Sequence, residues 1–192
     1  MGDKIQDSDI ELITKVRNGD LNAFRSLVNL YKDKSLSLAV SIVKNETVAE
    51  DILQDVFMKM SRNIGTFKFK SKFSTWLYKI VVNTCYTELK KKKNNISLEE
   101  NEGAIYYVSV MEEVPSLKLE DQQLYIHKAM KRLKADEALV LRLFYLCEMS
   151  LKEIEIITKF STSKIRVDLH RGRKNLHLIL KQLLGDEIDN LL

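Results

Sequence analysis

The sequence predicts an all-α fold of two small helical domains joined by a flexible, acidic linker. Residues that break helices are rare, with 6 Gly and 1 Pro in 192 residues, and 45% of the residues are hydrophobic. Apolar residues recur every three or four positions through most of the chain, which is the period of an amphipathic helix. The period fails in an acidic stretch near the middle. These observations predict a first domain at 1–93, a linker at 94–118 and a second domain at 119–192.

Four helices are expected in the first domain, and capping signals indicate where they begin. The segment Ser8–Glu11 has the form of a capping box and should open a short helix that ends near Gly19. Asp20 should cap a long second helix, and Thr47–Glu50 is a second capping box that should open the third helix. The fourth helix is expected from Phe73 onward, after a loop.

The third helix should present one face to a protein partner. Its apolar residues recur at helical spacing and should be buried, and they are Ala49, Ile52, Leu53, Val56, Phe57 and Met60. The opposite side mixes acidic, amide and apolar side chains. This mixture suits docking on a basic protein, although a plain solvated surface would have the same composition. The predicted docking face comprises Asp51, Gln54, Asp55 and Met58.

The stretch Thr66–Lys93 interleaves aromatic residues with lysines and holds a single acid, Glu88. Because aromatic rings stack on bases and lysines neutralise phosphates, this composition is typical of a surface for single-stranded nucleic acid. An amphipathic helix with a solvated basic face is the alternative. Phe73 is the aromatic most expected in the core, whereas Phe67 and Phe69 lie in the loop and have less structural reason to be buried. The outward face of the helix is predicted to carry Lys72, Thr75, Lys79, Asn83 and Tyr86.

A helix-turn-helix is predicted near the end of the second domain. Ser150–Glu153 is a third capping box that opens a short helix, a turn falls near Lys159–Ser161, and a long basic helix follows. Gly172 lies on the buried side of that helix and would let a neighbouring helix approach closely. Many antiparallel helix pairs share this shape, and the basic outward face is what favours DNA binding. That face carries Ser163, Arg166, His170, Arg173, Lys174 and His177.

The distribution of charge and the set of reactive side chains limit the classes of function that the sequence allows. The net charge is +4, and basic residues gather at 68–93 and 164–174 with acids between them, which suits two contacts on one polyanion. Cys85 and Cys147 fall in apolar helical patterns and are expected to be reduced and buried. No histidine spacing fits a zinc site, and no phosphate loop or activated nucleophile occurs, so no metal, cofactor or enzymatic activity is expected. No segment approaches a membrane span, which predicts a cytoplasmic protein without membrane insertion.

Two groups of motifs resemble bacterial sigma factors. AEDILQDVF at Ala49–Phe57, followed by FSTWLYKIVVN at Phe73–Asn83, resembles their region 2, and Ser150–Leu176 resembles their region 4. With only these two domains and a short linker, the chain resembles the extracytoplasmic-function (ECF) type. The resemblance implies a non-enzymatic subunit that binds core RNA polymerase. It also implies recognition of the −10 and −35 promoter elements, in single-stranded and duplex DNA, and promotion of DNA melting.

The resemblance also implies roles for individual residues. Docking on the clamp of the largest polymerase subunit would depend on Asp51, Gln54 and Asp55. The linker would run through the polymerase toward the RNA path. Recognition and opening of the −10 element would depend on Phe67, Lys68, Phe69, Lys70, Lys72, Trp76, Lys79 and Asn83. Recognition of the −35 element would depend on Ser163, Lys164, Arg166, His170, Arg171, Arg173 and Lys174.

The chain departs from the family pattern at three positions of the helix-turn-helix. Glu155, Lys159 and Asp168 replace a small residue, a glycine and a basic or polar residue, so the −35 preference of relatives does not transfer. Two other classes stay open at this point: a free-standing helix-turn-helix regulator that binds duplex DNA as a dimer, and an adaptor that binds a protein without touching DNA. An anti-sigma protein is a further partner considered beside core polymerase and promoter DNA.

Overall fold

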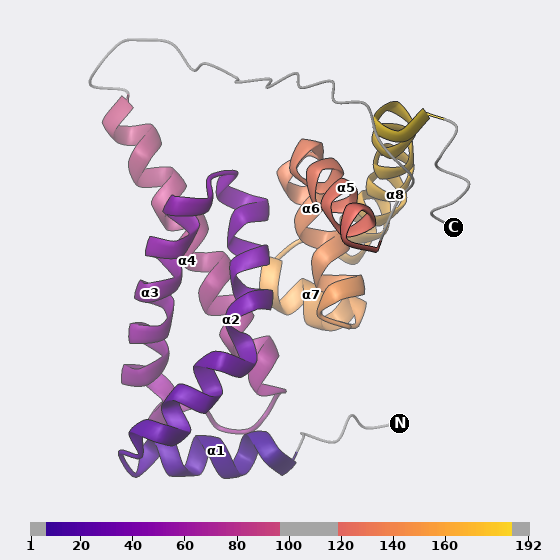
Figure 1. Ribbon diagram of the computed structural model, residues 1–192. Coiled ribbons are helices and arrows are strands. Elements are labelled where there is room, and N and C mark those ends of the chain that lie inside the picture. Colours follow the sequence, from indigo (N-terminus) through magenta and orange to yellow (C-terminus); the bar gives the residue numbers. More distant parts are fainter. Residues whose placement is uncertain (1–6, 97–118, 186–192) are drawn as a thin grey trace.

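The computed structural model describes residues 7–96 and 119–185, and all regular secondary structure in them is helical (Figure 1). The prediction of an all-α chain with two helical units is therefore confirmed. The first unit contains α1 (Asp7–Arg17), α2 (Leu21–Val43), α3 (Glu46–Asn63), the 3₁₀ turn η1 (Ile64–Thr66) and α4 (Phe73–Ile96). The second unit contains α5 (Leu119–Arg132), α6 (Ala135–Leu141), the π-helical turn η2 (Arg142–Leu146), α7 (Leu151–Thr158) and α8 (Thr162–Leu184). Residues 94–96, predicted as linker, continue α4, and the rest of the predicted linker lies outside the described residues.

Side-chain caps mark where α2, α3, α7 and α8 begin. The carboxylate of Asp20 accepts hydrogen bonds from the backbone N–H groups of Asn22 and Ala23, at 2.8 and 3.0 Å, which confirms the predicted cap of α2. The two capping boxes predicted in the first unit are wrong. Asn45 caps α3, two residues before Thr47, because its side-chain oxygen reaches the N–H of Val48 at 2.9 Å. Helix α1 begins at Asp7, so Ser8 lies inside it.

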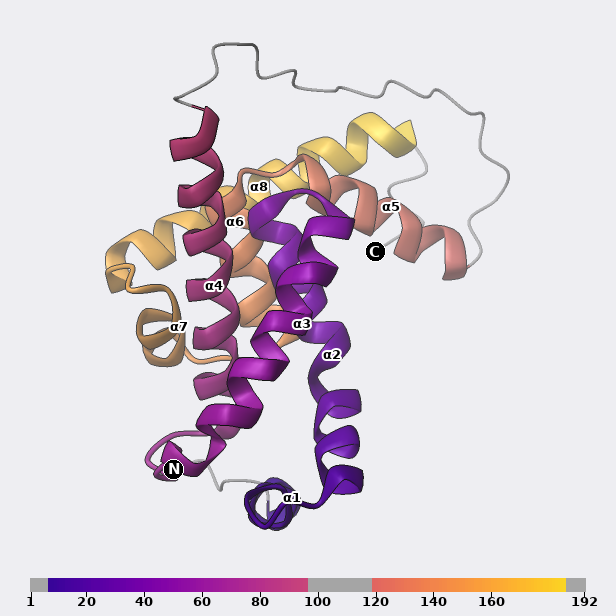
Figure 2. The same ribbon diagram turned by 90° about the vertical axis from the view of Figure 1, so that its left-hand side faces the viewer.

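The core of the first unit forms where α2, α3 and α4 pack together, and α1 lies across one end of this bundle (Figure 2). All six apolar residues that the helical period assigned to the inside of α3 are buried. Tyr31 of α2 and Tyr78 of α4 are also buried, and Tyr31 donates a hydrogen bond of 2.6 Å to Asp9 of α1. This contact ties α1 to the bundle.

The second unit holds the predicted helix-turn-helix in α7 and α8. The capping box at Ser150 and Glu153 is complete, which confirms that prediction. Lys159 ends α7 with a left-handed φ of 62°, a conformation that favours glycine and is strained for a lysine. Gly172 allows α8 to approach α6 closely, because an added Cβ would lie 3.0 Å from Cδ1 of Leu141.

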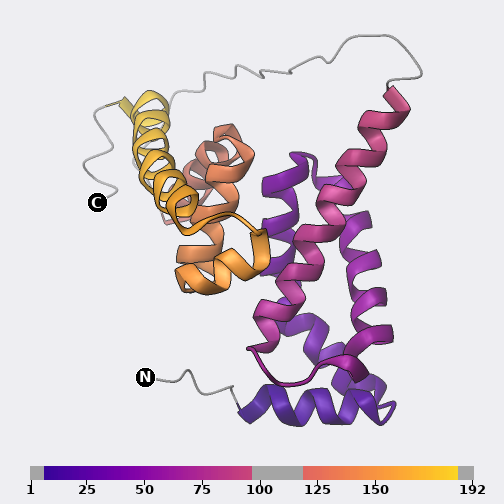
Figure 3. The ribbon, with the colours of Figure 1, turned by 180° about the vertical axis from the view of Figure 1, so that it is seen from behind.

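The two units contact each other along α4 and α2 (Figure 3). Helix α7 packs on α4, and α6 packs on α2. Arg142 donates from Nε to the hydroxyl of Ser37 at 2.8 Å, and Lys44 donates to the carbonyl oxygen of Leu133 at 2.8 Å. These side chains join elements that are far apart in the sequence, so their pairing was not predictable from local pattern.

Cys85 and Cys147 are both free thiols and both buried, as expected from their apolar surroundings. Burial raises the pKa of the Cys85 thiol to about 12 and that of the Cys147 thiol to about 11, which disfavours the reactive thiolate form. Among the described helices, none combines the length and the apolar character needed to cross a lipid bilayer.

Candidate protein and nucleic-acid interfaces

The predicted docking face of α3 is exposed. Asp51, Gln54, Asp55 and Met58 all lie on the solvent side of the helix, and Met58 keeps 53% of its surface accessible. Lys59 pairs with Asp55 at 2.7 Å one turn along the helix, but both side chains are solvated, so the pair contributes little stability. The face therefore offers acidic groups around one flexible apolar side chain. This is a chemistry suited to a basic protein surface.

The aromatic residues of the loop at 67–72 differ in their exposure to solvent. Phe67 is only 4% exposed, and its ring centroid lies 5.0 Å from Phe69, 5.6 Å from Phe73 and 5.5 Å from Trp76. The interpretation that Phe67 has little structural reason to be buried is therefore wrong, because the loop folds back onto the start of α4. Phe69 and Trp76 are partly exposed at the edge of the same cluster.

Arg17 of α1 holds this loop in place. Its guanidinium lies 4.7 Å from the ring centroid of Phe69, and its Nε donates to the carbonyl oxygen of Ile64 at 3.1 Å. A second guanidinium nitrogen donates to the carbonyl oxygen of Phe67. Phe69 adopts a left-handed φ of 54°, which turns its ring toward Arg17 and the aromatic cluster. Arg17 was missed in the sequence because its partners lie about fifty residues away along the chain.

The lysines of the predicted single-strand surface fall into two groups. Lys68 and Lys70 are exposed in the loop, whereas Lys72 and Lys79 are partly buried. Lys72 forms an ion pair of 3.5 Å with Glu153 of α7. Within this set, the loop therefore presents two solvated cations, Lys68 and Lys70, whereas Lys72 at the end of the loop and Lys79 in α4 are partly covered.

Thr75 is buried at 1% exposure, which contradicts its predicted place on the outward face of α4. Its hydroxyl donates to Oε1 of Glu153 at 3.1 Å and lies 3.9 Å from the sulfur of Met149. Burial alone would raise the pKa of the Glu153 carboxyl. The backbone amide and the hydroxyl of Ser150, together with Lys72 and Thr75, nevertheless hold this pKa below its usual value. One carboxylate thus caps α7 and joins it to α4.

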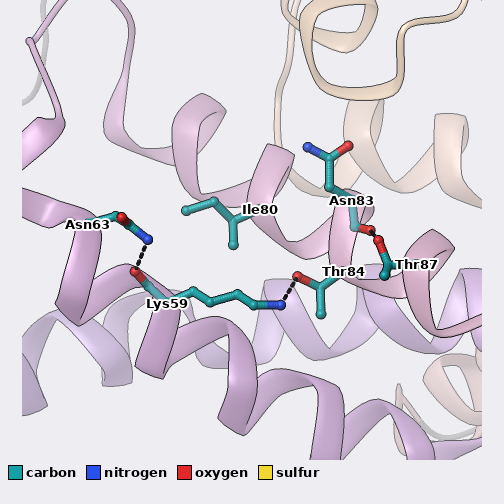
Figure 4. Close-up of a pocket in the computed structure, with 6 residues that line it drawn as sticks. All are labelled: Lys59, Asn63, Ile80, Asn83, Thr84 and Thr87. Carbon is teal, nitrogen blue, oxygen red and sulfur yellow. Dashed lines mark hydrogen bonds between the residues drawn. The ribbon is translucent and has the colours of Figure 1, made fainter.

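Asn83 lies farther along α4, beside α3. Together with Lys59, Asn63, Ile80, Thr84 and Thr87 it lines an open pocket of about 290 Å³ between the two helices (Figure 4). Lys59 reaches across from α3 and donates to the hydroxyl of Thr84 at 3.3 Å. The lining of the pocket is both polar and apolar, and the pocket adjoins the docking face, because Lys59 also pairs with Asp55.

The outward face of α8 matches its prediction, with one exception. Ser163, Arg166, His170, Arg171, Arg173 and Lys174 are all exposed. Lys164 instead donates to the carboxylates of Asp136 and Asp168, at 2.7 and 2.5 Å, and its ammonium lies 4.2 Å from the ring centroid of Phe160. Burial alone would lower the pKa of this ammonium, but the two carboxylates raise it. Its charge is therefore engaged within the second unit.

Two of the three residues that depart from the family pattern, Glu155 and Asp168, have partners within the second unit. Asp168 is one of the two acids that hold Lys164, and Glu155 accepts a hydrogen bond of 3.2 Å from the hydroxyl of Thr162. Asp136, which the sequence did not single out, also accepts from the hydroxyl of Tyr86 in the first unit at 3.3 Å. These contacts stabilise the geometry of α8 instead of adding charge to its outward face.

Family comparison agrees with this division into two units. The Sigma-70 region 2 family matches residues 27–95, and the Sigma-70, region 4 family matches residues 123–176. The chain is 33% identical over 182 residues to ECF RNA polymerase sigma factor SigW of Bacillus subtilis, covering 89% of this chain and 96% of that protein. It is 28% identical over 189 residues to the RNA polymerase sigma-H factor of Pseudomonas aeruginosa, covering 94% of this chain and 98% of that protein.

Two solved structures share the fold. The first is the sigma factor RpoE in complex with the anti-sigma factor NepR from Bartonella quintana, with a TM-score of 0.67, 23% identity, and coverage of 84% of this chain and 98% of that one. The second is CnrH in complex with the cytosolic domain of CnrY, with a TM-score of 0.60, 18% identity, and coverage of 92% of this chain and 99% of that one.

The fold and the two family matches define a two-domain transcription initiation factor. The chain belongs to the ECF RNA polymerase sigma factors. Sigma factors bind core RNA polymerase and are not enzymes, so the expectation of a non-enzymatic subunit is confirmed by family membership. Membership also excludes the two alternative classes of protein, the free-standing helix-turn-helix regulator and the adaptor that does not touch DNA.

Proposed function

We propose that this chain directs core RNA polymerase to promoters through three surfaces, one for the polymerase and two for DNA. Docking on the polymerase is what separates a sigma factor from other helix-turn-helix proteins. The observation that carries the proposal is therefore the separation of faces on α3, where six apolar residues are buried and Asp51, Gln54, Asp55 and Met58 are exposed. This face is the proposed contact with the polymerase clamp.

The upstream promoter element is the proposed ligand of α8. A helix that follows a tight turn can enter the major groove of duplex DNA with its outward residues against base edges and phosphates. Arg166 and Arg173 are long enough to reach either target, and a bidentate arginine contact to guanine contributes about 1–3 kcal/mol of discrimination. Lys164 is assigned a positioning role instead, because Asp136 and Asp168 already engage its ammonium.

Promoter opening is assigned to the loop at 67–72. The chain carries no nucleotide-hydrolysis motif, so binding of the separated strand must offset the cost of unstacking bases. Stacking on an aromatic side chain contributes about 1–3 kcal/mol per base. Phe69 is the loop aromatic that is partly exposed, and Phe67 supports it from the core side. The solvated Lys68 and Lys70 would hold the strand backbone, which makes this step sensitive to salt.

Full use of the α4 surface requires the two units to separate. Thr75 and Lys72 face Glu153 of α7, so a DNA strand that runs along the start of α4 would compete with α7 for the same surface. Binding of the α3 face to core polymerase is the proposed event that draws the units apart. The closed arrangement would then be the form of the chain before it joins the polymerase.

An anti-sigma protein is a second proposed partner. Both structural neighbours were solved in complexes, one with the anti-sigma factor NepR and the other with the cytosolic domain of CnrY. A regulator of this kind would compete with core polymerase for the chain. Because its proposed partners, core polymerase and promoter DNA, are in the cytoplasm, the chain would act there.

Charge reversal on α3 tests whether its exposed acidic face binds core polymerase. Asp51→Lys and Asp55→Lys, made separately, should each weaken association with core polymerase while the helical circular-dichroism signal stays that of the parent. Asp33→Lys is the matched control, because Asp33 is an exposed acid on α2. Co-purification of core with both α3 variants at the parental level would contradict the proposed docking face.

A further inference from the structure

Val167 lies on the outward face of α8, between Arg166 and Arg171 around the helix. Successive residues of an α-helix are 100° apart, so Ser163 four residues earlier and His170 three residues later lie on the same side. Ile165 and Leu169, the neighbouring aliphatic residues, point the other way and are buried. Val167 keeps 43% of its surface accessible. It is an apolar side chain on a polar and basic face.

Internal packing does not explain this residue. Val167 is neither in the buried core nor among the partly buried apolar residues that pack on it, within the described part of the chain. A β-branched side chain also lowers helix propensity slightly, so Val167 is not there to stabilise α8. It lies instead on the face that would enter a groove, with Arg166 on one side of it and Arg171 on the other.

We propose that Val167 recognises a thymine of the upstream promoter element through the C5-methyl group of that base. This inference rests on the proposed entry of α8 into the major groove. Thymine is the only one of the four bases that presents a methyl group there, and apolar side chains make the contact that distinguishes it. Arg166 and Arg171 would contact phosphates or base edges on either side and hold the short valine side chain at van der Waals distance.

A methyl contact has a distinct chemical test, because deoxyuridine differs from thymidine only by that methyl group. The experiment uses holoenzyme assembled from core polymerase and the full chain, with a duplex carrying an upstream element from a mapped promoter. Each thymine of the element is replaced in turn by deoxyuridine. With the parent chain, one replacement should weaken binding about fourfold, which corresponds to roughly 0.8 kcal/mol for one buried methyl group.

The decisive comparison is the same replacement series with Val167→Ala. The fourfold penalty at that one thymine should disappear, while the effects of all other replacements stay the same. Ile126→Ala is the matched control, because Ile126 is 41% exposed on α5, outside the helix-turn-helix, and its holoenzyme should keep the penalty. This comparison cancels any general change in affinity.

The outcomes separate this inference from the function on which it rests. If the parent holoenzyme distinguishes the upstream element from a scrambled duplex but no replacement matters, α8 reads DNA and Val167 does not read a methyl group. An undiminished penalty with Val167→Ala overturns the inference in the same way. Equal binding of the parent to both duplexes would overturn the proposed role of α8, and the inference with it.

Discussion

Gly172→Ala should destabilise the second unit, because the close approach of α8 to α6 would force side-chain atoms of α6 to shift by a few tenths of an ångström to admit a methyl group. An added Cβ would lie 3.0 Å from Cδ1 and 3.1 Å from Cγ of Leu141, and 3.4 Å from Cβ of Glu137. Leu141 is 3% exposed and has little freedom to move away. Overpacking costs about 1–3 kcal/mol, and the higher helix propensity of alanine offsets about 0.5–1 kcal/mol of it. A net loss of about 1 kcal/mol should lower the melting temperature by about 4–8 °C in a unit of this size.

Thermal unfolding followed by circular dichroism measures this effect. Gly65→Ala is the control, because no atom lies within 4 Å of an added Cβ there, and its melting temperature should stay close to that of the parent. In a Leu141→Ala background the same change at Gly172 should cost little, since the atoms that it meets have been removed. The reasoning is refuted if Gly172→Ala melts at or above the parental temperature, or if its cost is the same in both backgrounds.

Three further predictions concern DNA and the contact between the units. Arg166→Ala should reduce discrimination between the upstream element and a scrambled duplex by about 1–3 kcal/mol, measured by competition binding; an equal loss on both duplexes would make Arg166 a phosphate contact. Phe69→Ala should reduce permanganate reactivity of thymines in the polymerase–promoter complex, and a parental bubble would remove this ring from the melting surface. A carbodiimide should couple Lys72 to Glu153 in the free chain, because their charged atoms lie 3.5 Å apart. Core polymerase should lower that yield, and an unchanged yield would mean that the units stay docked.

Helical period was a sufficient guide to the faces of isolated helices. On α3 it separated all six buried apolar residues from the exposed docking face, because burial there follows from a single amphipathic stripe. It also placed Gly172 on the buried side of α8. Caps were less reliable, since Asn45 and Thr47 are both good capping residues and the hydrogen bond of the cap decides between them.

Residues whose environment comes from a distant part of the chain were placed wrongly or missed. Phe67 is buried because the loop folds onto α4 under Arg17, and Thr75 is buried because α7 covers it. Lys164 belongs to a basic sequence pattern, but Asp136 in α6 engages its ammonium. The candidate DNA surface was therefore recognisable by composition, whereas the exposed members of it depended on tertiary contacts.

The most direct test of the account is transcription by core polymerase on genomic DNA with and without this chain, with RNA 5′ ends mapped. The account predicts a discrete set of start sites that appear only with the chain and share two upstream sequence elements at a fixed spacing. Asp51→Lys should remove the set, because the chain would no longer join the polymerase. Identical start sites with and without the chain would contradict its assignment as the subunit that selects promoters.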